Sequence, residues 1–408
     1  MLFSFCNLHI DKHYPFSHIL AMAPPLNHRF RLFIKAITIL VVTCHLSPVT
    51  CRAEPSNYIR VAILQDAASL GLKVNGGYEI IDLANKKFLS RGKNLNTTVT
   101  VYKDSIWIDG KGFNTSKLSI KAGNSDAIKI DSRRFRGDIQ LIKGSDFLLS
   151  AINNIELEDY IKGILYHEAS HYWPDDALRA QAIVCRSYAI YQMQENVSKD
   201  YDVTSDIYSQ VYGGSISERY RTNKAVSETK GLVLTYQGRY FPSYYHATCG
   251  GHTEDASLLW NIDMAPLRGV PCNFCKDSPH FQWHNVLSEE EVRGQLIKAG
   301  YQLHNIKNIM ISQRDESGRV MNLKIRTDKK DINIPAKDFR NILGPNIVRS
   351  TNFSIKVVDH DIVLEGFGWG HGVGMCQWGA YFMAKQGYSY KQVLEYYYPG
   401  SQISLISK

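Results

Sequence analysis

The chain of 408 residues contains no internal repeats and no low-complexity tracts, and its hydrophobic content of 44% is that of a globular protein with a sizeable core. It is too long for one ordinary domain, so we expect roughly two or three packed units. The sequence also lacks a concentrated block of Lys or Arg. Its formal net charge of +8 therefore does not indicate a nucleic-acid-binding arm, and no nucleic-acid partner is expected. The charge is equally typical of a mild attraction to anionic surroundings and of an ordinary solvated surface.

A long hydrophobic run is also absent from the N-terminal region, although the pattern of an export signal is present. Basic residues precede the apolar run 36–42, and Cys51-Arg-Ala53 supplies small residues of the kind that a signal peptidase cuts after. His45 and Pro48 interrupt the run and leave it shorter than the roughly 20 apolar residues needed to span a bilayer. We therefore expect a cleaved signal peptide, with an uncleaved membrane anchor as the alternative.

Cysteine is scarce. Five cysteines lie beyond the signal region, and an odd number of cysteines cannot form a fully paired disulfide framework. Cys249-x-x-His252 and Cys272-x-x-Cys275 form two short pairs whose spacing suits a closed tetrahedral zinc site. A site with four protein ligands would be structural, and a disulfide between two of these cysteines is the alternative. The remaining two cysteines are expected to be small buried hydrophobes: Cys185 and Cys376.

A glutamate lies on the apolar face of a predicted helix. The face is defined by residues at helical spacing: Leu157, Tyr160, Ile161, Ile164 and Leu165. Glu168 occupies the next position of this stripe. Burying an ionised carboxylate without a partner is costly, so Glu168 would keep its proton at neutral pH, as a general acid must. The alternative is that the helix ends before Glu168 and leaves an ordinary surface residue.

The same glutamate belongs to the string His167-Glu168-Ala-Ser-His171, which matches the HExxH signature of zinc proteases. That chemistry requires an uninterrupted helix and a third metal ligand, yet Pro174 follows closely. Glu195 is the candidate third ligand, with no supporting pattern around it. A zinc metalloprotease is therefore an alternative function.

Several motifs follow one another between residues 150 and 400. They are Leu157-Glu-Asp-Tyr-Ile-Lys-Gly-Ile-Leu-Tyr-His-Glu168, Leu178-Arg-Ala-Gln-Ala-Ile-Val-Cys-Arg-Ser-Tyr188, Asp202-Val-Thr-Ser-Asp206, Ser209-Gln-Val-Tyr-Gly213, Tyr245-His-Ala-Thr-Cys-Gly-Gly251, Gly368-Trp-Gly-His-Gly-Val-Gly-Met375, Gln377-Trp-Gly-Ala380 and Tyr398-Pro-Gly400. The chain resembles in these blocks the SpoIID/LytB family, whose members read like LEDYLxGVVxxEM followed by LKAQAVAARTYA. That family includes SpoIID, a lytic transglycosylase, and LytB, described as an enhancer of a wall amidase.

The resemblance implies a function and a set of site residues. Glu168 matches the catalytic glutamate of a peptidoglycan lytic transglycosylase, which cleaves MurNAc-GlcNAc strands to 1,6-anhydroMurNAc ends in cell-wall remodelling during sporulation or division. Peptide-free strands are one candidate substrate. The implied substrate-binding residues are Arg186, Tyr188, Gln210, Tyr212, His246, Trp369, His371 and Gln377. Helix packing with a salt bridge is the alternative for Arg186 and Tyr188, and a structural turn with a core Trp for the loop around Trp369.

The resemblance also implies partners, and the N-terminal signal pattern implies a location. The partners are peptidoglycan glycan strands, a cell-wall amidase and other wall-remodelling or division proteins. The second hypothesis for function is a non-catalytic amidase enhancer that binds the cell wall. No cofactor is expected for catalysis, and a zinc ion bound by the predicted ligands would be structural. The protein is expected to be exported, and to be periplasmic, cell-wall associated or extracellular.

Strands and helices are expected in separate segments. Residues 58–155 show short alternating stretches typical of strands, and the period changes to helical from Leu157 onward, with a second helix at 177–194. We therefore predict an α+β fold, with a helical catalytic core packed on β-rich segments and a small inserted α/β subdomain. The predicted domains are a signal peptide region at 1–53, an N-terminal β-rich region at 54–150, the first part of the core at 151–286, an inserted docking subdomain at 287–349 and the second part of the core at 350–408.

Overall fold

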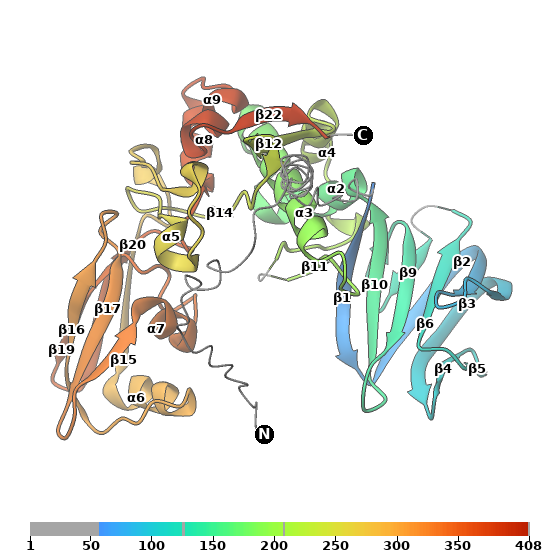
Figure 1. Cartoon of the computed structure of the whole chain (residues 1–408), viewed down its shortest axis with the longest axis horizontal. Helices are drawn as coiled ribbons and strands as arrows, with labels where there is room; N and C mark the ends of the chain where they lie inside the picture. The colour runs from blue at the N-terminus through green and yellow to red at the C-terminus, as the bar shows by residue number, and fades with distance from the viewer. Residues whose placement is uncertain (1–56, 125–126, 207–208, 407–408) are drawn as a thin grey trace, which may run out of the picture. The chain divides into compact units, whose positions relative to one another are not determined.

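The computed structural model describes residues 57–124, 127–206 and 209–406 (Figure 1). The predicted signal peptide region at 1–53 lies outside these residues. Strands dominate residues 58–156 and helices residues 157–228, and this segregation confirms the predicted α+β class. Among the described residues, no helix has the length and apolar character required to cross a membrane.

The N-terminal segment folds into a large, mainly antiparallel sheet. Its strands are β1 (Tyr58–Ala67), β2 (Ser69–Asp82), β3 (Phe88–Tyr102), β4 (Ser105–Ile108), β5 (Lys111–Phe113), β6 (Lys117–Ala122), β7 (Ile128–Ile130), β8 (Arg133–Phe135), β9 (Asp138–Lys143) and β10 (Leu149–Glu156). Side chains alternate between buried and exposed along strands such as β2, as expected for a sheet with one face on the core. The strand β11 (Val203–Thr204) extends this sheet by pairing in parallel with β1.

The last strand of the sheet runs directly into the helical core. β10 ends at Glu156, and α2 (Leu157–Glu168) begins at the next residue with Glu158 and Asp159 in its first turn, where the helix dipole favours negative charge. The helix α3 (Asp175–Glu195) is buried on nearly all sides because α2, α4 (Tyr220–Glu228), α8 (Gln377–Lys385) and α9 (Tyr390–Tyr397) all pack on it. Figure 1 shows α2, α3 and α4 side by side.

Short strands and turns complete the core. They are β12 (Leu232–Tyr236), β13 (Arg239–Tyr240), β14 (Tyr245–His246), β21 (Met375–Cys376), β22 (Gln402–Leu405), α5 (Ala256–Trp260) and the 3-10 helices at Ser215–Ser217, Ala265–Leu267 and Phe274–Asp277. β14 pairs in parallel with β21, with Tyr245 opposite Met375 and His246 opposite Cys376, which brings two distant segments together.

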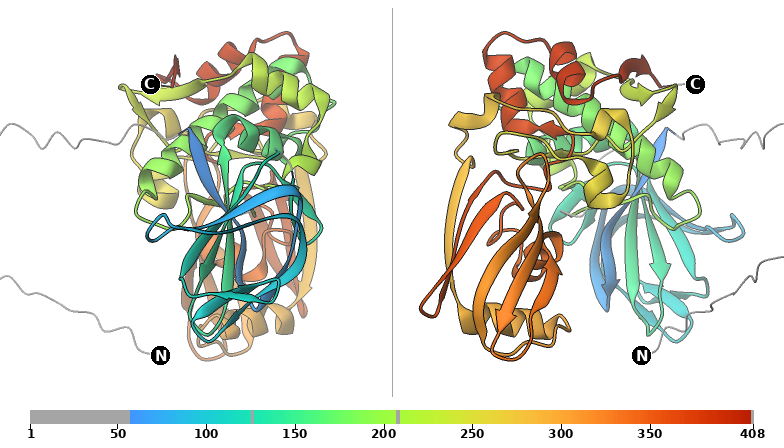
Figure 2. Two further views of the ribbon diagram at one scale, coloured as in Figure 1. Left: turned by 90° about the vertical axis from the view of Figure 1, so that its right-hand side faces the viewer. Right: turned by 60° about the vertical axis from the view of Figure 1, so that its left-hand side comes forward.

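The inserted unit has a hydrophobic core of its own. It comprises β15 (Gln282–Ser288), α6 (Glu289–Lys298), β16 (Ile306–Arg314), β17 (Val320–Thr327), β18 (Ile332–Pro335), α7 (Ala336–Leu343), β19 (Phe353–Val358) and β20 (Asp361–Phe367). The strands form two small sheets, in the orders β15–β20–β19 and β16–β17–β18 (Figure 2). The core therefore begins before and ends after the predicted boundaries of 287–349, because β15, β19 and β20 supply buried side chains to it.

Candidate active site

Glu168 is the last residue of α2, at the end of the buried stripe that the sequence predicted. The stripe residues are buried and Glu168 is half-buried, which places this residue at the border between the apolar core and the surface. Its Oε1 accepts a hydrogen bond from the backbone N–H of Val211 over 3.3 Å. The side chains of Tyr245 and Gln377 also hydrogen-bond the carboxyl group.

Burial raises the pKa of Glu168 from 4.5 to about 7, although the hydrogen bonds from Val211, Tyr245 and Gln377 act in the opposite direction. The position at the C-terminal end of α2 also disfavours the charged form, because the helix dipole places partial negative charge there. Among the described residues, none of the groups that hydrogen-bond this carboxyl is itself a carboxylate. The group can therefore hold a proton at neutral pH and release it without a large change in environment.

Two of the predicted substrate-binding residues are buried in the core. Gln210 is 1% exposed; its Oε1 accepts from the Tyr160 hydroxyl over 3.0 Å, and its Nε2 donates to the Tyr245 hydroxyl over 3.3 Å. Tyr212 is equally buried, and its hydroxyl donates to Oδ1 of Asn153 over 2.8 Å. The prediction that Gln210 and Tyr212 touch sugar is therefore corrected, because their polar atoms are already bonded inside the core. Gln210 instead orients Tyr245, a partner of Glu168 that the sequence analysis did not select.

Arg186 and Tyr188 are also placed in the protein interior. The guanidinium of Arg186 is fully buried and donates two hydrogen bonds of 2.9 Å to the carboxylate of Glu158. It also donates to the carbonyl of Leu232 over 3.0 Å. Tyr188 is nearly buried, and its ring lies 5.9 Å from that of Tyr244. The prediction of substrate binding is corrected for both, in favour of helix packing and a buried ion pair.

Two histidine side chains lie close together at the Gly-rich loop, which comprises residues 368–374. The rings of His246 and His371 lie 5.7 Å apart, and Nδ1 of His371 accepts from the backbone N–H of Val373 over 3.1 Å. Burial lowers the pKa of His246 well below its usual range and, with the charges of Arg340 and Arg319, lowers the pKa of His371 to about 3. Both rings are therefore neutral at physiological pH. Among the described residues, Nε2 of His246 has no hydrogen-bond partner.

A row of half-buried aromatic side chains begins just after α2 and leads to this loop. The ring of Trp173, just beyond α2, lies 5.3 Å from that of Trp378, and His280 lies 6.2 Å from Trp378 and 4.8 Å from Trp369. The guanidinium of Arg349 lies 4.8 Å over the ring of Trp369. Such flat surfaces with polar edges suit the apolar faces and hydroxyl groups of sugars. Trp173 and Trp378 were not selected from the sequence, although Trp378 follows Gln377 directly.

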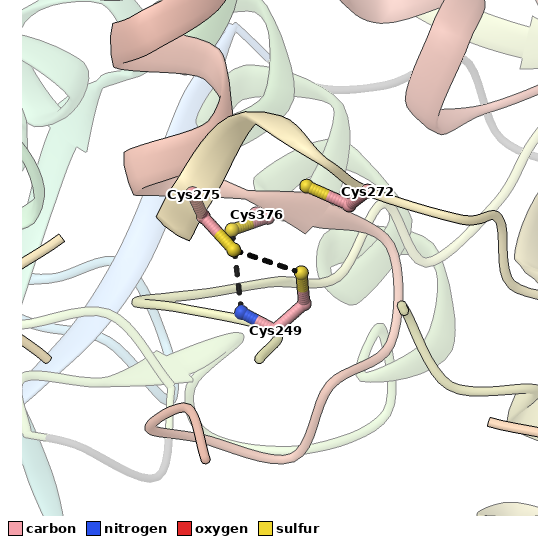
Figure 3. Close-up of side chains that lie close together, drawn as sticks. All are labelled: Cys249, Cys272, Cys275 and Cys376. Carbon is pink, nitrogen blue, oxygen red and sulfur yellow. Dashed lines mark hydrogen bonds between the residues drawn. The ribbon is translucent and has the colours of Figure 1, made fainter. Parts of the chain in front are cut away.

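Four buried cysteines meet in the core at one point: Cys249, Cys272, Cys275 and Cys376 (Figure 3). Their sulfur atoms all lie within 4.8 Å of one another. His252, predicted as a ligand, is not in this cluster; its Nδ1 lies 2.6 Å from the carbonyl oxygen of Thr253. The structure thus brings Cys376, which the sequence predicted to be an isolated buried residue, together with the three other cysteines, and leaves His252 outside the group. Cys185 lies elsewhere in the core, and burial raises its pKa to about 12.

The HExxH string does not form a metal site. α2 ends at Glu168, and Ala169 has extended backbone angles (φ −142°, ψ 133°), so His171 lies outside the helix. His167 is engaged elsewhere, because its Nε2 shares a hydrogen bond of 2.6 Å with the hydroxyl of Ser217. The two histidines therefore do not lie one helical turn apart, as zinc-protease chemistry requires, and the metalloprotease alternative is dropped.

Comparison with known proteins identifies the family to which the chain belongs. Residues 147–236, which include Glu168, match the family described as stage II sporulation protein (SpoIID). Residues 272–374, which include the inserted unit, match a domain of unknown function. An uncharacterized protein of Brachyspira hyodysenteriae is 35% identical over 352 residues, which cover 85% of this chain and 93% of that protein. The chain belongs to the SpoIID/LytB family.

Two further relatives of the chain come from Bacillus subtilis. The amidase enhancer of Bacillus subtilis is 26% identical over 390 residues, covering 84% of this chain and 50% of that protein. The stage II sporulation protein D of Bacillus subtilis is 27% identical over 270 residues, covering 62% of this chain and 76% of that protein. This SpoIID/LytB member thus spans half the length of the amidase enhancer.

Proposed function

We propose that this SpoIID/LytB protein is a peptidoglycan lytic transglycosylase that cleaves MurNAc-GlcNAc glycan strands in cell-wall remodelling during sporulation or division. The observation that carries the proposal is the carboxyl group of Glu168, half-buried at the end of α2 with a pKa raised to about 7. A carboxylic acid with this pKa is matched to proton transfer at neutral pH. Membership of a family that contains a stage II sporulation protein D supports the same conclusion.

The reaction needs one residue to move a proton twice. Glu168 in its acid form donates its proton to the glycosidic oxygen as the bond from C1 of MurNAc to that oxygen breaks. The carboxylate then accepts the proton of the C6 hydroxyl as the C6 oxygen bonds to C1, which leaves a 1,6-anhydro end and returns Glu168 to its acid form. A second carboxylate, which most glycosidases require, is not needed because attack within one sugar has a high effective molarity.

The remaining groups of the site have supporting roles. Tyr245 and Gln377 hydrogen-bond the carboxyl group of Glu168 and so hold it in one orientation during both transfers. The half-buried aromatic rings of Trp378 and Trp369 offer faces on which sugar rings can stack. His371, held neutral by burial, accepts a hydrogen bond at Nδ1 from the Val373 N–H, so its other ring nitrogen can donate one to a sugar hydroxyl.

A non-catalytic amidase enhancer is the second candidate. It is favoured by one observation, that the likeness to the amidase enhancer covers 84% of this chain whereas the likeness to the sporulation protein covers 62%. In that case the aromatic row would bind glycan while a separate cell-wall amidase cleaves. Under either function we propose that the protein is exported and acts at the cell wall, with glycan strands and wall-remodelling or division proteins as its partners.

Digestion of purified glycan strands, analysed by mass spectrometry, tests the proposal. Products with 1,6-anhydroMurNAc ends are expected from the wild type and from Glu195→Gln, a control in an exposed glutamate of α3. They are expected to be lost in Glu168→Gln, which should still bind the strands. Reducing ends would indicate a hydrolase. If the folded wild type binds strands but yields no products, while it stimulates an amidase, the enhancer function replaces the catalytic one.

A further inference from the structure

The four cysteines at the base of the Gly-rich loop form a compact and fully closed group. Each of them is 0% exposed, and their sulfur atoms lie within 4.8 Å of one another, with 3.4 Å between the sulfurs of Cys249 and Cys275. Zinc bound tetrahedrally by thiolates at about 2.3 Å places its sulfur atoms about 3.8 Å apart. The cluster is therefore already close to the size that one such ion requires. Figure 3 shows the four cysteine side chains lying close together.

Hydrogen-bond donors surround the sulfur atoms. The sulfur of Cys376 accepts from the backbone N–H groups of Cys249 and Gly379, each over 3.3 Å, and it caps the N-terminus of α8. The hydroxyl of Tyr397 lies 3.1 Å from the sulfur of Cys272. Donors of this kind and a helix N-terminus stabilise thiolates, and a zinc ion with four thiolates carries excess negative charge that must be offset. A side chain at Gly379 would collide with Tyr397, so the close packing of α8 against Tyr397 requires glycine at this position.

We propose that Cys249, Cys272, Cys275 and Cys376 bind one structural zinc ion. Binding releases the thiol protons to solvent, and four sulfur ligands fill the tetrahedral shell, so no position is left for a reactive water. His252 takes no part, because its ring is directed at the Thr253 carbonyl. A pair of disulfides would also use all four sulfurs, and it is the outcome against which the test is designed.

The zinc ion would join chain segments on both sides of the inserted unit. Cys249, Cys272 and Cys275 precede this unit, and Cys376 follows it. The ion would therefore clamp the two connections at the base of the insertion and close a long loop, which is where a cross-link removes most entropy from the unfolded chain. Arg319 of the inserted unit reinforces the junction, because its Nη2 donates to the Cys249 carbonyl over 2.7 Å and its Nε lies 3.3 Å from a carboxylate oxygen of Glu254.

The ion would also stabilise the strand pair that supports Glu168. β14 supplies Tyr245 and β21 leads into Gln377, and both of these side chains hydrogen-bond the carboxyl of Glu168. Cys376 is adjacent to Gln377 in the chain and lies opposite His246 in the pair. The four cysteines are thus positioning residues for the acid, an extension that rests on the proposed transglycosylase function, whereas zinc binding itself does not.

Elemental analysis of the dialysed protein is the primary test. About one zinc per chain is expected for the wild type, for Cys185→Ser and for His252→Ala, since the last two residues lie outside the cluster. Cys376→Ser should lose most of the zinc. Cobalt exchanged into the wild type should show the thiolate-to-metal absorption of a tetrahedral site, a readout that does not depend on a variant folding. Absence of zinc together with loss of free thiols in the denatured wild type would establish disulfides and overturn the proposal.

A second measurement separates this proposal from the proposed function. Zinc content, thiol content and melting temperature are recorded beside glycan cleavage for the wild type and Cys376→Ser. Zinc without any cleavage would leave the metal site intact and count against the transglycosylase. Cleavage by a wild type that contains no metal would support the transglycosylase and count against the zinc site. If a folded Cys376→Ser protein has lost zinc but still cleaves glycan, the ion does not position Glu168.

Discussion

The side-chain amide of Gln377 donates a hydrogen bond to the backbone carbonyl of Glu168 over 2.9 Å, although the two residues lie 209 positions apart in the chain. This carbonyl is among the last of α2, and such carbonyls have no partner within their helix. Gln377 also hydrogen-bonds the carboxyl group of Glu168. One side chain from the C-terminal part of the core therefore holds both the backbone and the acid group of the residue proposed to transfer protons.

Replacement of Gln377 by Ala should reduce turnover of glycan strands by about 10- to 100-fold, because a small misplacement of an acid at a reacting bond is costly. KM should change much less, since Gln377 is buried and acts through Glu168. Steady-state kinetics of the wild type and the variant separate the two constants. A raised KM with unchanged kcat would show instead that Gln377 contacts the substrate directly.

The activity of the wild type should decline as the pH rises through about 7, because Glu168 must be protonated to act as the acid and burial raises its pKa to about 7. Gln210→Ala removes the amide that orients Tyr245 toward this group, so it should move the descending limb of the profile and lower kcat. The pH dependence of kcat/KM measures both effects. A limb that stays in the range of a free glutamate, near pH 4.5, would contradict the assignment of Glu168.

Glu168→Gln should stabilise the protein at alkaline pH relative to the wild type. A carboxyl whose pKa is raised in the folded state, here to about 7 from 4.5, contributes stability below its unfolded pKa and loses it as the pH rises through the folded value. The variant lacks this loss, so the difference in unfolding free energy should grow by about 1 to 3 kcal/mol between about pH 5 and about pH 8. Denaturant unfolding at the two pH values tests this, with Glu195→Gln as the control; equal curves would disprove the pKa shift.

Arg186→Ala should destabilise the fold by about 3 to 5 kcal/mol, because it leaves the Glu158 carboxylate and the Leu232 carbonyl without their buried partner. Its KM for glycan should match that of the wild type in the folded fraction, since the guanidinium is fully buried. Unfolding curves and KM measured below the transition test the two parts. A raised KM with unchanged stability would restore the substrate-binding role that the sequence predicted.

Trp369→Ala should weaken binding of glycan strands by about 10-fold, since a stacked aromatic ring contributes on the order of 1 to 2 kcal/mol. Trp107→Ala is the matched control, because this half-buried tryptophan lies on β4, toward one edge of the N-terminal sheet. Equilibrium binding in a Glu168→Gln background avoids cleavage during the measurement. Unchanged affinity for Trp369→Ala would indicate that the ring serves only the Gly-rich loop.

The positions of the main secondary structure elements followed from local sequence patterns. The stripe that ends at Glu168 predicted a buried helix face, and α2 has that face. The strands predicted within 58–155 also formed, as β1 to β10. Period and turn residues determine such elements because their causes lie within a few residues of chain. The family was identifiable for a related reason, since its motifs are contiguous strings.

What each side chain contacts depended on pairings that no local pattern contains. Arg186 and Gln210 lie within motifs and have the chemistry of ligand-binding groups, yet both are bonded inside the core. The spacing Cys-x-x-His favoured His252 as a zinc ligand, but the left-handed turn at Gly250 and Gly251 directs that ring to Thr253. Cys376 entered the cluster instead through the parallel pairing of β14 with β21.

The sequence by itself determined the family, the helix that carries Glu168 and the apolar side of that helix, because these depend on contiguous residues. Only the tertiary structure decided that Val211, Tyr245 and Gln377 meet at the carboxyl group and that four cysteines, without a histidine, converge nearby. The physical reason is the length of chain between the partners. Contacts across such separations arise from packing of the whole core, and hydrophobic packing is non-directional and has no short sequence signature.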